Sequence, residues 1–213
     1  MLPRAKLNTA AQRLAGLPLV SLAAVGLALI ASLSSTASGE LEFQRLALLQ
    51  GEGWRLWTGH FVHFGLLHLL SDSLALLLLA GLVERHWGHR DSGLLLLGGA
   101  PLLAALLLLL APTLHVYRGL SGLVWLCAAP ALASLWPHTR LRPALLLLVA
   151  LAVLKLSLDQ TTPSPLTPGI PPELWAHRSG ALLGVLAVVL RSLSRPSTTA
   201  IRQSAPPAPE PRR

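Results

Sequence analysis

The sequence predicts an all-α integral membrane protein, and two features of its composition indicate this class. Of the 213 residues, 53% are hydrophobic and only 12% are charged, which is about half the charged fraction of a soluble domain. Uninterrupted leucine runs, such as Leu106 to Leu110 and Leu145 to Leu148, leave no polar stripe for a water-facing helix surface. These features exclude an amphipathic bundle in water and favour helices that cross a lipid bilayer.

Six apolar segments approach the roughly 20 residues that a spanning helix needs. They cover residues 17–36, 64–83, 93–112, 119–137, 141–158 and 173–191. The connectors between them carry charges, prolines and other turn residues. We therefore expect a cytoplasmic N-terminus over residues 1–16, one six-helix membrane domain over 17–191 and a disordered, basic cytoplasmic tail over 192–213.

The basic residues predict the direction in which the helices cross the membrane. With both termini in the cytoplasm, most of the 17 Lys and Arg residues lie inside, and the outer side holds Arg45, Arg55, Arg118, Lys155 and Arg178. Inner loops of membrane proteins are enriched in basic residues, so this orientation is favoured. The same placement accounts for the net charge of +8, and we expect no nucleic-acid partner.

The first segment has a competing interpretation. Its basic start, its apolar run and the small residues from Ala37 to Gly39 also resemble a signal peptide. The apolar run is long for a signal peptide, so we expect a retained helix. The other five segments keep their orientation in either case.

Polar groups fall at the predicted outer ends of three helices, and ionisable groups at membrane depth indicate function. His68 and Asp72 are four residues apart and therefore share one helix face. Ser121, flanked by Gly119 and Gly122, opens the fourth segment. Unpaired N–H groups at the start of that helix suit an oxyanion that develops beside the serine.

The third polar group is His177 in the sixth segment, three residues before Gly180. Gly180 and Gly184 form a small-residue face that lets a neighbouring helix approach closely. An imidazole beside such a face can act as a general base. Taken singly, Ser121 is typical of a packing serine and His177 of an interfacial histidine. Together with His68 and Asp72 they supply the parts of an acyl-transfer site.

With these stretches in place, the chain resembles the rhomboid intramembrane serine proteases, and their small bacterial branch, the rhombosortases, most of all. The resemblance covers about residues 50 to 190 and rests on three motifs in order: Trp54-Arg55 with His63-x4-His68, Gly119-x-Ser121-Gly122, and Ala176-His177-x2-Gly180-x3-Gly184. The spacing of Gly81, Glu84 and Gly88 also looks like a family pattern. The branch resemblance rests on small size and on the stretch from Tyr117 to Gly122.

The resemblance implies that Ser121 is the nucleophile and His177 its general base, without a third member and without a cofactor or metal. His68 and residue 72 would support the oxyanion beside the Ser121 N–H, and Trp54 and Arg55 would have a structural role in the outer loop.

Position 72 departs from the family, because rhomboids usually carry asparagine there. An ionised carboxylate only accepts hydrogen bonds, whereas an amide also donates. Three alternatives follow for Asp72. It is protonated and donates, it is held by His68 as an ion pair, or the chain is a slow or inactive protease.

The implied partners are membrane lipid and single-span or C-terminally anchored substrates, cleaved near the outer face of a bacterial inner membrane. Exported proteins with a tail of Gly-Gly motif, hydrophobic helix and basic end would be included. Two other classes remain. A non-catalytic rhomboid-like protein that binds transmembrane helices is disfavoured by the intact Ser121 and His177, and a transporter by the apolar inner halves of the helices. No zinc site is expected, because His60, His63 and His68 lack further acidic or cysteine ligands.

Overall fold

The computed structural model describes residues 16–33, 35–158 and 174–194. Nearly all of the predicted N-terminus (1–16) and tail (192–213), and the whole connector before the sixth segment (159–172), lie outside these residues. Within the described part the regular structure is mostly helical, as the composition predicts.

Each predicted apolar segment coincides with a helix. These helices are α2 (Leu19–Ala31), α6 (Leu66–Trp87), α7 (His89–Leu110), α8 (Ser121–Leu135), α9 (Arg142–Leu158) and α10 (Leu174–Ser194). Four helical stretches are long and apolar enough to cross a membrane: Leu66–Trp87, His89–Leu110, Thr139–Leu158 and Leu174–Ser194. The chain is therefore a multi-pass membrane protein.

The predicted count of six spans is supported by length for four helices only. Helix α2 has 13 residues and α8 has 15, so they are about 20 and 22 Å long at 1.5 Å per residue. The hydrocarbon core of a bilayer is about 30 Å thick. A six-span bundle that includes α2 and α8 stays a prediction.

The connector predicted between the second and third segments is almost entirely helical. Helix α6 continues through the charged residues to Trp87, and α7 starts two residues later at His89. Gly88 between them has φ +87°, a backbone region that favours glycine. The charged residues therefore lie on helix ends rather than in a loop.

Glu84, in the last turns of α6, holds the start of α2. Its carboxylate accepts hydrogen bonds from the N–H groups of Val20 and Ser21 at 2.8 and 3.0 Å and from the Ser21 hydroxyl at 2.8 Å. A carboxylate at a helix N-terminus accepts hydrogen bonds from N–H groups that have no partner within the helix, and its negative charge interacts favourably with the positive end of the helix dipole. Glu84 therefore has a structural role at the end of the bundle opposite the candidate site.

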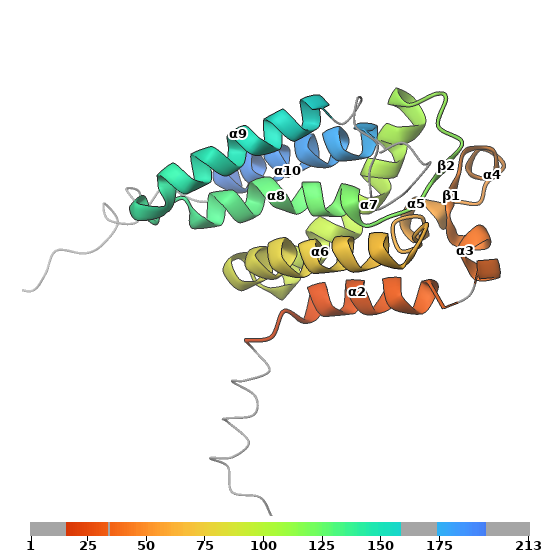
Figure 1. Cartoon of the computed structure of the whole chain (residues 1–213), viewed down its shortest axis with the longest axis horizontal. Helices are drawn as coiled ribbons and strands as arrows, with labels where there is room; N and C mark the ends of the chain where they lie inside the picture. The colour runs from red at the N-terminus through yellow and green to blue at the C-terminus, as the bar shows by residue number, and fades with distance from the viewer. Residues whose placement is uncertain (1–15, 34, 159–173, 195–213) are drawn as a thin grey trace, which may run out of the picture.

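Short elements fill the loop between α2 and α6: α3 (Ser35–Leu41), β1 (Phe43–Gln44), α4 (Arg45–Leu49) and α5 (Arg55–Thr58). Strand β1 pairs antiparallel with β2 (Val116–Tyr117), with Phe43 opposite Tyr117. A 3-10 turn, η1 (Thr139–Leu141), leads into α9. In Figure 1 the helices α3, α4 and α5 and the two strands gather at the end of the bundle where α6, α8 and α10 begin.

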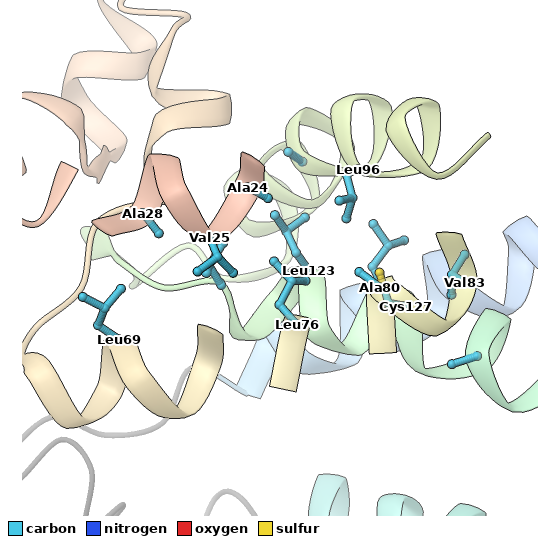
Figure 2. Packing of buried hydrophobic residues seen from close by; sticks show 14 residues of the cluster. Ala24, Val25, Ala28, Leu69, Leu76, Ala80, Val83, Leu96, Leu123 and Cys127 are labelled. Carbon is cyan, nitrogen blue, oxygen red and sulfur yellow. The ribbon is translucent and has the colours of Figure 1, made fainter. Parts of the chain in front are cut away.

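The core between α2, α6, α7 and α8 is built from small and branched apolar side chains. Figure 2 shows Ala24, Val25 and Ala28 of α2 facing Leu76 and Ala80 of α6, with Leu123 and Cys127 of α8 beside them. Alanines in this layer let the helices approach closely. Leucines on the outer faces are exposed, as suits a surface that meets lipid.

Candidate active site

The turn that precedes α8 passes directly over His68 and Asp72. Gly119 has φ +133°, and a Cβ atom at this position would lie 3.0 Å from Nε2 of His68 and 3.2 Å from Oδ2 of Asp72. Both the backbone angle and the close approach therefore require glycine. Three of the predicted site residues, Gly119, His68 and Asp72, are thus brought together.

Asp72 lies at ion-pair distance from two histidines. Its Oδ2 atom is 3.2 Å from Nε2 of His68 and 3.5 Å from Nε2 of His63. The two imidazole rings are 5.0 Å apart between centroids. His63 was not predicted as a site residue, although the His-x4-His spacing contains it, and the structure adds it to the site.

His63 also holds the backbone beside the predicted nucleophile. The N–H of Leu120 donates to Nε2 of His63 at 3.3 Å. The same Nε2 atom therefore faces both the Leu120 N–H and the Asp72 carboxylate.

Arg118 fastens the same turn to the outer loop. Its Nε atom lies 2.6 Å from a carboxylate oxygen of Glu42, and its guanidinium lies 5.2 Å from the ring centroid of Phe64. The Phe64 ring is parallel to that of His68 at 6.3 Å. The cation, the aromatic ring and the imidazole therefore form one stack that limits the movement of His68.

Arg55 braces the outer loop from inside, as the family resemblance implies. It is 6% exposed, and its guanidinium donates to the carbonyl oxygens of Gly39 and Glu42 at 3.1 and 2.7 Å and to the carboxylate of Glu52 at 2.6 Å. Trp54 beside it is 53% exposed. An exposed indole at this end of the bundle suits the membrane interface.

Tyr117 is a second residue of the site that was not predicted. Its hydroxyl donates to the carbonyl oxygen of Gly119 at 2.7 Å and accepts from the N–H of Gly122 at 3.3 Å. The hydroxyl therefore bridges the residues on either side of Leu120 and Ser121. Tyr117 begins the motif on which the branch resemblance rests, but its role could not be predicted, because its partners are backbone groups of a turn that only the fold defines.

Ser121 is the first residue of α8 and is partly buried. Helix N–H groups in the first turn have no partner within the helix. Here the N–H of Gly122 is taken by Tyr117, whereas the N–H of Ser121 takes part in no hydrogen bond among the described residues. A backbone donor beside the serine oxygen, at the positive end of a helix, is the arrangement that an oxyanion requires.

His177 lies in the first turn of α10, which packs against α8 through glycines. A Cβ atom on Gly180 would overlap the carbonyl oxygen of Gly122, and one on Gly184 would overlap that of Leu126. His177 is one turn before Gly180 and is 9% exposed, with its ring centroid 6.0 Å from that of Trp125 in α8. The glycine contacts bring the starts of the two helices together. The predicted pairing of Ser121 as nucleophile with His177 as general base stays a prediction.

His60 is buried beneath this turn. Its Nε2–H donates to the carbonyl oxygen of Ala100 at 3.0 Å, and its ring makes an edge contact with Tyr117 at 5.5 Å. Burial lowers the pKa of His60 to about 4, although its backbone hydrogen bonds act in the opposite direction. His60 is therefore neutral at physiological pH and serves as a structural donor.

These helices and this turn define a multi-pass membrane protein with a cluster of serine, histidine and carboxylate groups at one end of its bundle. The rhomboid domain matches the chain over residues 50–194, which is most of its length. The chain belongs to the rhomboid family, a family of intramembrane proteases whose members are generally serine hydrolases. The family-level resemblance is thus confirmed. No curated protein matched the chain.

Proposed function

We propose that this rhomboid protein is an intramembrane serine endopeptidase in which Ser121 is the nucleophile and His177 the general base. The close packing of Gly180 on Gly122 carries the proposal. It brings the first turn of α10 beside the first turn of α8, and these turns contain His177 and Ser121. A nucleophile and a base must come within hydrogen-bond reach in the reacting complex.

The proposed reaction is acyl transfer in two steps. As the Ser121 oxygen attacks the scissile carbonyl carbon, His177 takes the hydroxyl proton and then passes it to the leaving amine. Water next attacks the acyl-enzyme and loses a proton to His177, and His177 returns that proton to the Ser121 oxygen as the ester bond breaks and the acid product leaves. In both steps the negative oxygen would accept a hydrogen bond from the Ser121 N–H at the positive end of α8.

For Asp72 we favour the ion-pair alternative. An isolated carboxylate beside the oxyanion would repel it, but the His68 ring lies 3.2 Å from Asp72 and, in its protonated form, would pair with that charge. The pair would be nearly neutral overall, with its positive ring beside the turn at Gly119. In this account Asp72 positions His68 and donates no hydrogen bond to the substrate.

The short length of α8 supports a site below the membrane surface. At about 22 Å, α8 is shorter than the hydrocarbon core. Its far end carries Trp136 and leads to the exposed His138, which suit the inner interface. The start of α8 at Ser121 would then lie several ångströms inside the opposite face.

The remaining parts of the proposal follow from the basic residues and from the family. Both termini would be cytoplasmic, and the site would face the outer side of a bacterial inner membrane. Substrates would be single-span or C-terminally anchored membrane proteins. The stretch from Tyr117 to Gly122 resembles the serine motif of rhombosortases. This resemblance adds a further class of substrates: exported proteins whose C-terminal tail has a Gly-Gly motif, a hydrophobic helix and a basic end.

Cleavage of a membrane-anchored reporter with a Gly-Gly tail tests the proposal. Purified protein and reporter would be reconstituted together in lipid vesicles, and cleavage followed for wild type, Ser121→Ala and His177→Ala. Ser134→Ala is a matched control, because it removes a hydroxyl from α8 that binds only the carbonyl oxygen of Pro130. We expect cleavage by wild type and the control alone. Cleavage by Ser121→Ala would overturn the assignment.

A second candidate is a rhomboid-like protein that binds transmembrane helices without cleaving them. Asp72 is the observation that favours it, because a carboxylate stands where the family usually has an amide donor. Such a protein would retain the reporter in the membrane uncleaved. Stable capture of the reporter by folded wild type without any cleavage would favour this candidate.

A further inference from the structure

The hydroxyl of Tyr117 joins the two ends of the turn that carries Ser121. Its bonds to the Gly119 carbonyl oxygen and the Gly122 N–H are both buried, and Tyr117 itself is 3% exposed. We infer that Tyr117 is a positioning residue, whose hydroxyl sets this turn so that the Ser121 N–H faces the oxyanion. The inference rests on the proposed serine protease function.

The phenol ring is fixed by contacts that do not involve the turn. Strand pairing places Tyr117 opposite Phe43, and the two rings make an edge contact at 6.5 Å. The His60 ring makes a second edge contact with Tyr117 and is itself hydrogen-bonded to the carbonyl oxygen of Ala100 in α7. The position of the hydroxyl is therefore supported by contacts that are independent of the turn.

The turn needs this support because its own backbone can adopt several conformations. Gly119 at φ +133° has no Cβ to restrict it. With the Tyr117 hydroxyl in place, the carbonyl of Gly119 and the N–H of Gly122 are both occupied, while Leu120 is held by His63. Without the hydroxyl, the Gly122 N–H would lack a partner, and the peptide groups around Ser121 would be free to reorient.

A positioning role predicts a loss of rate without a loss of fold. Tyr117→Phe keeps the ring contacts with Phe43 and His60 and removes only the oxygen. Misplacing a reacting group by about 1 Å costs on the order of 100-fold, and losing an oxyanion donor costs 100- to 1,000-fold. We expect Tyr117→Phe to react about 10- to 100-fold more slowly, with kcat reduced and KM unchanged.

The experiment measures the second-order rate at which a fluorophosphonate labels Ser121 in detergent, together with thermal unfolding. Wild type, Tyr117→Phe and the matched hydroxyl deletion Ser134→Ala are compared, and the reporter assay supplies kcat and KM. The expected result is slow labelling of Tyr117→Phe alone, with an unfolding midpoint close to that of Ser134→Ala.

Three results would count against the inference. Labelling of Tyr117→Phe within twofold of a reactive wild type would overturn it and leave the protease proposal intact. A Tyr117→Phe protein that no longer folds would also overturn it, because the hydroxyl would then support the whole fold rather than this turn. Failure of folded wild type to react would overturn the proposed function first and this inference with it.

Discussion

Gly180 of α10 lies against the carbonyl oxygen of Gly122 in α8, so closely that even one added methyl group would overlap it. Gly122 directly follows Ser121, and His177 is one turn before Gly180. The distance between these two helices therefore sets the distance between the proposed nucleophile and base. Packing and chemistry depend here on the same pair of glycines.

Substitution of Gly180 by alanine is expected to separate the two helices. The added Cβ meets backbone rather than a flexible side chain, and overpacking of this kind costs about 1–3 kcal/mol. Labelling of Ser121 should fall together with stability. Gly98→Ala is the matched control, because Gly98 lies in α7 with nothing within 4 Å of an added Cβ. Equal unfolding midpoints for the two variants would contradict the helix contact.

Asp72→Asn tests the proposed ion pair between this carboxylate and His68. If Asp72 pairs with His68, the neutral amide removes the ion pair and should lower stability by about 1–3 kcal/mol, while labelling stays within about tenfold of wild type. Thermal unfolding and labelling rates check this. A rate more than tenfold higher would instead show that the carboxylate repels the oxyanion, and unchanged stability would show that no ion pair forms.

The buried His60 predicts a loss of stability in acid. Its pKa in the folded protein is about 4, below the usual 6.5. Between pH 6.5 and 4 the unfolded chain therefore binds a proton that the folded chain does not, and the free energy of unfolding falls as the pH falls. The full effect is about 3 kcal/mol, from 1.36 kcal/mol for each pKa unit.

Unfolding in detergent from pH 7 to 4 measures this effect as the difference between wild type and His60→Gln. The glutamine amide can still donate to the Ala100 carbonyl but does not titrate. His138→Gln, at an exposed position after α8, is the control for the loss of an imidazole. A constant difference between wild type and His60→Gln over this range would show that His60 does not resist protonation.

The apolar helices could be predicted from sequence because runs of leucine need no partner to be recognised. The outer loop could not. Its short elements depend on contacts distant in sequence, such as Arg55 with the carbonyl oxygen of Gly39 and Phe43 paired with Tyr117. A local sequence pattern does not indicate which distant residues will be in contact.

The candidate site was predictable to the extent that its residues fall in motifs. His68 and Asp72 share a helix face by spacing alone, and the structure brings both to Gly119. His63 and Tyr117 were missed as site residues because they bind backbone groups of Leu120, Gly119 and Gly122. Those groups come within reach only when the turn before α8 has formed.

The most direct test of the central claim is covalent labelling of the folded protein with a fluorescent fluorophosphonate, followed by peptide mapping. The probe requires an activated serine and no knowledge of the substrate. We predict a single adduct on Ser121 in wild type, and no adduct in Ser121→Ala or His177→Ala. An adduct on another residue, or labelling of His177→Ala at the wild-type rate, would contradict a Ser121 and His177 dyad.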